Sequence, residues 1–161
     1  MQMSTRARYA VMAMVDLASR QSIGCECGPV CLAEIAASQQ LSLSYLEQIF
    51  ARLRRAGLVA SARGPGGGYR LAHQWDRISI AAIAAAVDEP IRVTCRDDAS
   101  GPCHALPGKA AERCQTHDLW TELGHQIALF LDGVTLADVV LGKIRGRALP
   151  PAGAIARIAA E

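Results

Sequence analysis

The chain has 161 residues, of which 51% are hydrophobic and only 4% are aromatic. A chain of this length can form one domain of ordinary size, alone or with an appendage, but not several domains. Its composition, rich in Ala, Leu, Ile and Arg, is typical of a mainly helical protein. The net charge is only +2, but residues 1–75 hold eight basic and four acidic side chains (a balance of +4) and residues 76–161 hold nine and eleven (a balance of −2). The basic first half favours a polyanionic partner there.

No membrane-spanning or secretory segment is expected. The apolar stretch at 9–18 is too short to cross a bilayer, follows Arg6 and Arg8, contains Asp16 and lacks a small-residue cleavage site. We therefore expect a cytoplasmic protein without membrane contact. In that compartment clustered cysteines more often bind metals or take part in redox chemistry than form disulfides.

Three helices are expected first. Apolar residues at helical spacing predict helices over about 5–19, 32–38 and 42–56, with Ser42 as the N-cap of the third. The third helix should bury Leu43, Leu46, Ile49, Phe50 and Leu53, and leave outside Ser44, Tyr45, Glu47, Gln48, Arg52 and Arg55. Two helices joined by a short turn, over about 32–56, match a helix-turn-helix whose second helix can enter the major groove of DNA. Many helical hairpins with polar outer faces bind nothing, so this pair of helices alone does not establish DNA binding. The segment that follows makes DNA binding the better interpretation.

That segment is the run Arg63-Gly-Pro-Gly-Gly-Gly-Tyr69, which lies between two short expected strands at 58–63 and 69–72. A phosphate-binding loop would need a helix after its glycines, and a Walker lysine is missing, so this kind of site is excluded. Strand, glycine-rich tip and strand predict instead a two-stranded wing over 58–72. Glycines at the tip, Gly66 and Gly67 among them, let the backbone lie close to DNA, and Arg63 can donate to a phosphate or reach into the minor groove.

The second half of the chain predicts a helix at 80–87 capped by Ser79, a loop at 88–116, a long helix at 118–131 and a short one at 136–141 capped by Thr135. One side of the long helix carries Leu119, Trp120, Leu123, Ile127 and Phe130. This side should pack on the first helix or on a second subunit. The expected organisation is a winged helix-turn-helix domain at 1–87, a metal-binding loop at 88–117, a dimerisation helix with a short helix at 118–142, and a mobile basic tail at 143–161.

Four potential metal ligands lie in and beside the loop, namely Cys95, Cys103, Cys114 and His117. Three thiolates and one imidazole can hold a [2Fe–2S] cluster or a tetrahedral zinc ion. The tight Cys-x2-Cys pairs of structural zinc sites are missing, so the loose spacing suits a larger, labile cofactor better. Three unrelated free thiols are the plain alternative.

A second group of cysteines, Cys25, Cys27 and Cys31, lies in the loop before the second helix. These thiols could bind another metal or react with oxidants. We favour the simpler interpretation that they are exposed, reduced thiols without a required role.

The chain resembles the bacterial winged-helix family of iron–sulfur, redox and nitric-oxide responsive regulators, and within it the regulators of iron–sulfur cluster assembly. The resemblance covers about residues 3–141. It is carried by the stretches Arg8-Tyr-Ala-Val, Leu43-Ser-Tyr-Leu-Glu-Gln-Ile-Phe50, Arg63-Gly-Pro-Gly-Gly-Gly-Tyr69, Cys114-Gln-Thr-His117-Asp-Leu-Trp120 and Phe130-Leu-Asp-Gly-Val-Thr-Leu136.

The resemblance implies a homodimeric, cluster-sensing transcription factor that binds a pseudo-palindromic operator in double-stranded DNA and controls cluster-assembly genes. It implies one [2Fe–2S] cluster per subunit, held by Cys95, Cys103, Cys114 and His117. It also implies DNA contacts by Ser44, Tyr45, Glu47, Gln48 and Arg63.

Two other classes of function stay open. One is a zinc- or thiol-redox-responsive winged-helix repressor. The other is an electron-transfer or cluster-carrier protein that uses the same ligands. An enzyme is not expected, because no nucleophile, base and orienting group can be assembled from the sequence.

Overall fold

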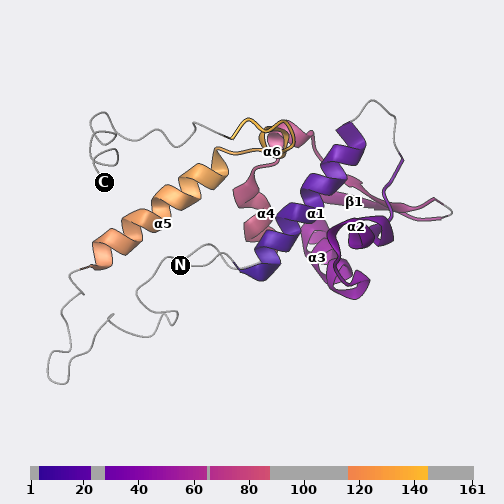
Figure 1. Cartoon of the computed structure of the whole chain (residues 1–161), viewed down its shortest axis with the longest axis horizontal. Coiled ribbons are helices and arrows are strands. Elements are labelled where there is room, and N and C mark those ends of the chain that lie inside the picture. The colour runs from indigo at the N-terminus through magenta and orange to yellow at the C-terminus, as the bar shows by residue number, and fades with distance from the viewer. Residues whose placement is uncertain (1–3, 23–27, 65, 88–115, 145–161) are drawn as a thin grey trace, which may run out of the picture.

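The structure is a computed structural model that describes residues 4–22, 28–64, 66–87 and 116–144 (Figure 1). The elements, in chain order, are α1 (Thr5–Ser22), α2 (Leu32–Gln39), α3 (Leu43–Arg55), β1 (Val59–Ala62), β2 (Gly68–Leu71), the 3-10 turn η1 (Trp75–Arg77), α4 (Ile80–Val87), α5 (His117–Asp132) and α6 (Leu136–Val140). The two strands form an antiparallel hairpin. A mainly helical protein with a two-stranded wing is therefore confirmed.

The core lies where α1 crosses the helix-turn-helix and α4. Ala10, Ala13 and Met14 of α1 are fully buried. The small alanine side chains let neighbouring helices approach α1 closely, since no bulky side chain separates the backbones. From α3 the core receives Leu46, Ile49, Phe50 and Leu53, as expected. The prediction that Leu43 is buried is wrong, because its side chain is 42% exposed. As the first residue of α3 it has no preceding helical turn to cover it.

The wing is joined to the body by a contact that the sequence did not indicate. Tyr69 of β2 pairs with Val30, each backbone N–H donating to the other's carbonyl oxygen at 2.8 Å. A side chain at Gly68 would lie 2.3 Å from the Val30 carbonyl oxygen, so only glycine permits this approach. The Leu71 amide also donates to Gln21 Oε1 of α1 at 3.1 Å. These bonds hold the base of the wing against α1 and the start of α2. The strands run over Val59–Ala62 and Gly68–Leu71 instead of the expected 58–63 and 69–72.

α4 and α6 begin where the sequence predicts, whereas α5 begins at His117, one residue before its expected start. Ser79 Oγ accepts from the Ala82 amide at 3.1 Å and so caps α4. Thr135 and Asp138 form a reciprocal capping box at the start of α6. The Ile80 amide donates to the Val134 carbonyl at 2.8 Å, and this bond joins the start of α4 to the segment between α5 and α6.

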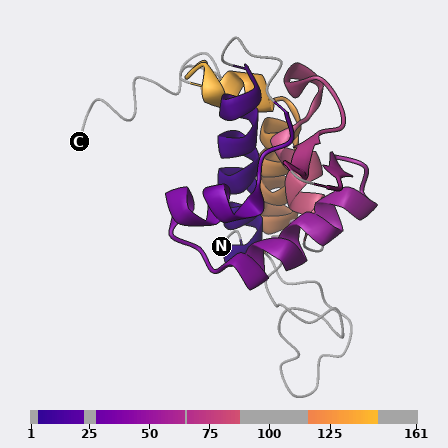
Figure 2. The same cartoon turned by 90° about the vertical axis from the view of Figure 1, so that its right-hand side faces the viewer.

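α5 lies to one side of the body formed by the first four helices, as Figure 1 and Figure 2 show from perpendicular directions. Its large apolar side chains remain exposed, namely Leu119 (60%), Trp120 (38%), Leu123 (36%), Leu129 (67%) and Phe130 (39%). The apolar side of this helix was expected to pack on the first helix or on a second subunit. Within one chain, α1 does not cover these side chains. No helix in the described part of the chain is long and apolar enough to cross a membrane.

Candidate nucleic-acid interface

The turn between α2 and α3 depends on two residues. Gln40 takes the left-handed conformation (φ 54°), and its amide donates to the Ala36 carbonyl, which ends α2. Ser42 is extended, and its hydroxyl accepts from the Tyr45 amide at 3.3 Å. The cap expected at Ser42 is confirmed. Three residues separate α2 from α3, and such a short turn between two helices is the arrangement of a helix-turn-helix.

The position of α2 against α1 is set by Asp16, whose side chain is 12% exposed. Its carboxylate accepts from Arg20 Nε at 2.7 Å and from Gln39 Nε2 at 3.2 Å, and also from the Ser38 hydroxyl. Burial alone would raise the pKa of Asp16, but the hydrogen bonds from Arg20, Ser38 and Gln39 lower it below its usual value. The sequence reasoning missed this network. The spacing of Asp16 and Arg20 on one helix face was the available signal.

After Leu43, the exposed residues of α3 are mainly polar. Ser44 and Gln48 lie one helical turn apart on this helix, at positions i and i+4, and both are exposed. Glu47 is exposed beside them. Tyr45 is half-buried, because its ring packs edge-on against Tyr9 of α1 with the ring centres 6.1 Å apart. We call the exposed set Ser44, Glu47 and Gln48 the recognition face. Tyr45 stands at its edge and also anchors α3 to α1.

The wing tip has the backbone that its glycines were expected to provide. Gly64 and Gly66 have φ values of 106° and 77°, a region that side chains disfavour. A side chain at Gly67 would lie 2.6 Å from the Ala62 carbonyl oxygen, so this half-buried glycine is required by the turn itself. Arg63 is exposed directly after β1. The structure therefore presents the recognition face and an exposed wing arginine from consecutive elements.

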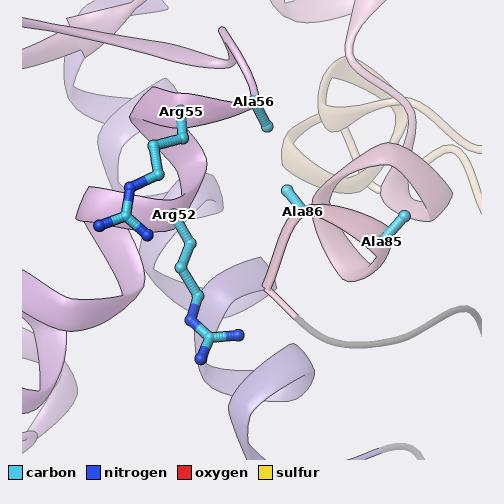
Figure 3. Close-up of a pocket in the computed structure, with 5 residues that line it drawn as sticks. All are labelled: Arg52, Arg55, Ala56, Ala85 and Ala86. Atoms are coloured by element: carbon cyan, nitrogen blue, oxygen red, sulfur yellow. The ribbon is translucent and has the colours of Figure 1, made fainter.

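A shallow pocket near the end of α3 was not expected from the sequence. It is lined by Arg52, Arg55, Ala56, Ala85 and Ala86, and so lies between α3 and α4 (Figure 3). Arg52 Nη1 donates to the carbonyl oxygen of Val87, the last residue of α4, at 2.9 Å. Arg52 thus has a partner within the fold, whereas the sequence placed it only on the outer face.

The expected metal ligands lie almost entirely outside the described residues. Cys95, Cys103 and Cys114 fall between 88 and 115, and His117 is placed only as the first residue of α5. Among the residues that the structure describes, no three His, Cys, Asp or Glu side chains gather as a metal site. Cys31 is exposed at the start of α2, while Cys25 and Cys27 lie outside the described ranges.

Comparison with known proteins agrees with this architecture. The Rrf2 family model, described as an iron-dependent transcriptional regulator, matches residues 3–141. The chain is 45% identical over 142 residues to the HTH-type transcriptional regulator IscR of Aliivibrio salmonicida, an alignment that covers 88% of this chain and 78% of that protein.

Solved structures give the same result. IscR of T. potens superposes with a TM-score of 0.68 at 32% identity and covers 93% of both chains. CymR, described as the global cysteine regulator of B. subtilis, superposes with a TM-score of 0.69 at 32% identity, over 88% of this chain and 98% of the other. The resemblance and the winged-helix fold inferred from the sequence are confirmed. These relatives are named as regulators, in agreement with the expectation that the chain is not an enzyme.

Proposed function

This chain belongs to the Rrf2 family of iron-dependent transcriptional regulators, and from that premise we propose that it is a homodimeric transcription factor that senses an iron–sulfur cluster and controls cluster-assembly genes. One observation carries the proposal. The exposed recognition face of α3 is followed by a wing whose conformation requires glycine, in a chain 45% identical to an IscR regulator. Because this function requires access to chromosomal DNA, we also propose a cytoplasmic location.

In the proposed complex α3 enters the major groove of an operator. The Gln48 amide can both donate to and accept from an adenine edge. Glu47 can accept from cytosine N4 but repels phosphate, so it penalises some sequences. Ser44 and Tyr45 extend the contact along α3, while Arg63 donates to a phosphate or enters the minor groove. Gly66 and Gly67 let the wing backbone come close to the DNA.

The exposed side of α5 is the proposed dimer interface. Leu119, Leu123 and Phe130 fall on one strip of this helix, at positions i, i+4 and i+11, with Trp120 at the edge of the strip. Exposed apolar area of this kind is typical of a surface that a partner covers. A twofold dimer of a helix-turn-helix protein reads two half-sites about 34 Å apart, which is why we propose a pseudo-palindromic operator.

The donor chemistry fits a [2Fe–2S] cluster. Cys95, Cys103 and Cys114 supply thiolates, the ligands that hold iron–sulfur clusters, and His117 supplies one imidazole. A bound cluster would supply a redox-active and chemically labile centre. His117 supplies a neutral imidazole, a weaker donor to iron than the anionic thiolates, so it would retain the cluster least firmly. Its position at the start of α5 joins the ligand set to the proposed dimer helix.

Anaerobic purification followed by visible absorption and by iron and sulfide assays tests the cluster. A red-brown protein with about two iron and two sulfide ions per chain, lost in Cys95→Ala, Cys103→Ala or Cys114→Ala, is expected. Colourless protein that contains zinc would overturn the cluster and leave a zinc-responsive repressor. A coloured protein that shows no salt-dependent binding to duplex DNA in either state would instead indicate a cluster carrier.

A further inference from the structure

α4 is the helix that connects the other parts of the fold. It contacts α1, α3 and α5, and it buries Ile80, Ile83, Ala84 and Val87. Its first turn is joined to the end of α5, because Ser79 Oγ donates to Asp132 Oδ1 at 3.3 Å. The backbone bond from Ile80 to Val134 lies beside this contact. Any displacement of α4 must therefore be accommodated by α1, α3 and α5 together, since packed helices transmit shifts as rigid elements.

One residue of α3 donates a hydrogen bond to the last turn of α4. The final carbonyl groups of a helix have no partner within the helix, and a cation near them also interacts favourably with the helix dipole. Arg52 supplies both a hydrogen-bond donor and a positive charge there, because its Nη1 donates to the Val87 carbonyl at 2.9 Å. In Figure 3 its guanidinium extends from α3 toward the end of α4. Ala85 and Ala86, which line the pocket, have side chains small enough to leave that space open.

The hydrogen bond between Arg52 and Val87 lies directly before the segment that contains the proposed cysteine ligands. Val87 is the last residue of α4, and the segment at 88–115 that follows it contains Cys95, Cys103 and Cys114. On α3, Arg52 lies one turn after Gln48, a member of the recognition face. The bond between Arg52 and Val87 thus connects the start of the ligand-bearing segment to the helix that is proposed to read DNA.

We propose that Arg52 is a positioning residue that couples the state of the ligand-bearing segment to the DNA affinity of α3. The inference rests on the proposed function. When the ligands after Val87 are engaged, the last turn of α4 is restrained, and its carbonyl groups hold the Arg52 side chain and the end of α3 in one position. When they are released, the anchor loosens and the recognition face loses its alignment with the groove. An arginine that only contacted DNA phosphate would act equally in both states.

The test compares DNA affinity with and without the cluster. A duplex selected from a random pool by the cluster-loaded wild-type protein is titrated with both states of the wild type, Arg52→Met, Arg52→Lys and Arg55→Met. Arg55 lines the same pocket from the same helix, so Arg55→Met is the matched control. Arg52→Met should reduce the ratio of the two affinities at least about threefold toward one, a modest part of an ordinary allosteric coupling. Arg52→Lys, which keeps a cationic donor, should recover part of the ratio, and Arg55→Met should leave it unchanged.

A second readout uses the cluster-free protein alone. Hydrogen exchange at the last turn of α4 should be faster in Arg52→Met than in Arg55→Met, because the end of the helix loses its cap. Equal exchange in the two variants would overturn the inference. So would an equal loss of affinity in both cluster states with a salt slope reduced by about one, the sign of a phosphate contact. A wild-type ratio of one would overturn the proposed cluster sensing, and the coupling with it; a larger wild-type ratio that Arg52→Met preserves would overturn the coupling alone.

Discussion

Replacing Asp16 with Asn should destabilise the helix-turn-helix measurably, since Asp16 accepts three side-chain hydrogen bonds, one from Arg20 of α1 and two, from Ser38 and Gln39, that tie α1 to the end of α2. Hydrogen bonds to a charged group contribute more than neutral ones, and Asn keeps the shape but not the charge or the full acceptor capacity. We expect a loss of about 1–3 kcal/mol in the free energy of unfolding. For a chain of this size that corresponds to a midpoint lowered by about 3–8 °C.

The same substitution should remove a pH dependence. The pKa of Asp16 is lowered in the folded chain, chiefly because the hydrogen bonds from Arg20, Ser38 and Gln39 outweigh the effect of burial. Its contribution is therefore present above the unfolded pKa of about 4 and is lost as the pH falls through the lower folded value. The difference in stability between wild type and Asp16→Asn should shrink as the pH is lowered from 7 toward 3.

Thermal and urea unfolding of the full chain, followed by circular dichroism at several pH values, measures both effects. Glu34→Gln is the matched control, because Glu34 also pairs with Arg20, at 3.2 Å, but its side chain is 60% exposed. An exposed pair of this kind contributes about 0.5 kcal/mol or less. If Asp16→Asn is no more destabilising than Glu34→Gln, or if the difference between Asp16→Asn and wild type does not change with pH, the assignment of Asp16 as the link between α1 and α2 is wrong.

Three further predictions concern DNA, the cluster and the dimer. Gln48→Ala should relax sequence preference by about 1–3 kcal/mol at one operator position, whereas Arg63→Ala should weaken binding to every duplex and lower the salt slope by about one. Competition binding with mutated operators separates these effects, and an equal loss on all sequences for Gln48→Ala would refute base reading. His117→Ala should shorten the lifetime of the cluster in air while the dimer remains folded; an unchanged decay of the visible absorption contradicts this role. Leu123→Glu should weaken self-association at least about tenfold in sedimentation equilibrium, because it places a charge on the apolar strip of α5, and an undiminished dimer would exclude α5 as the interface.

The parts of the site that depend on neighbouring residues were predictable. The Ser42 cap, the polar side of α3 and the glycine-dependent tip of the wing follow from preferences that act over a few residues. Leu43 shows the limit of such reasoning. Periodicity placed it with the buried stripe, but burial at the first residue of a helix depends on which neighbouring element extends over it.

Sequence alone was sufficient to determine the order of the α-helices and strands and the family, because helix periodicity, caps and turn glycines are local signals and the motifs are distinctive. Only the tertiary structure decided which side chains meet. Gln39 and Asp16 are 23 positions apart, Arg52 and Val87 are 35 apart, and Leu71 and Gln21 are 50 apart. No local preference selects such partners, because their distance is set by how the helices pack around the alanines of α1. The same packing leaves the large apolar side chains of α5 exposed, and this is the surface that we propose for the dimer.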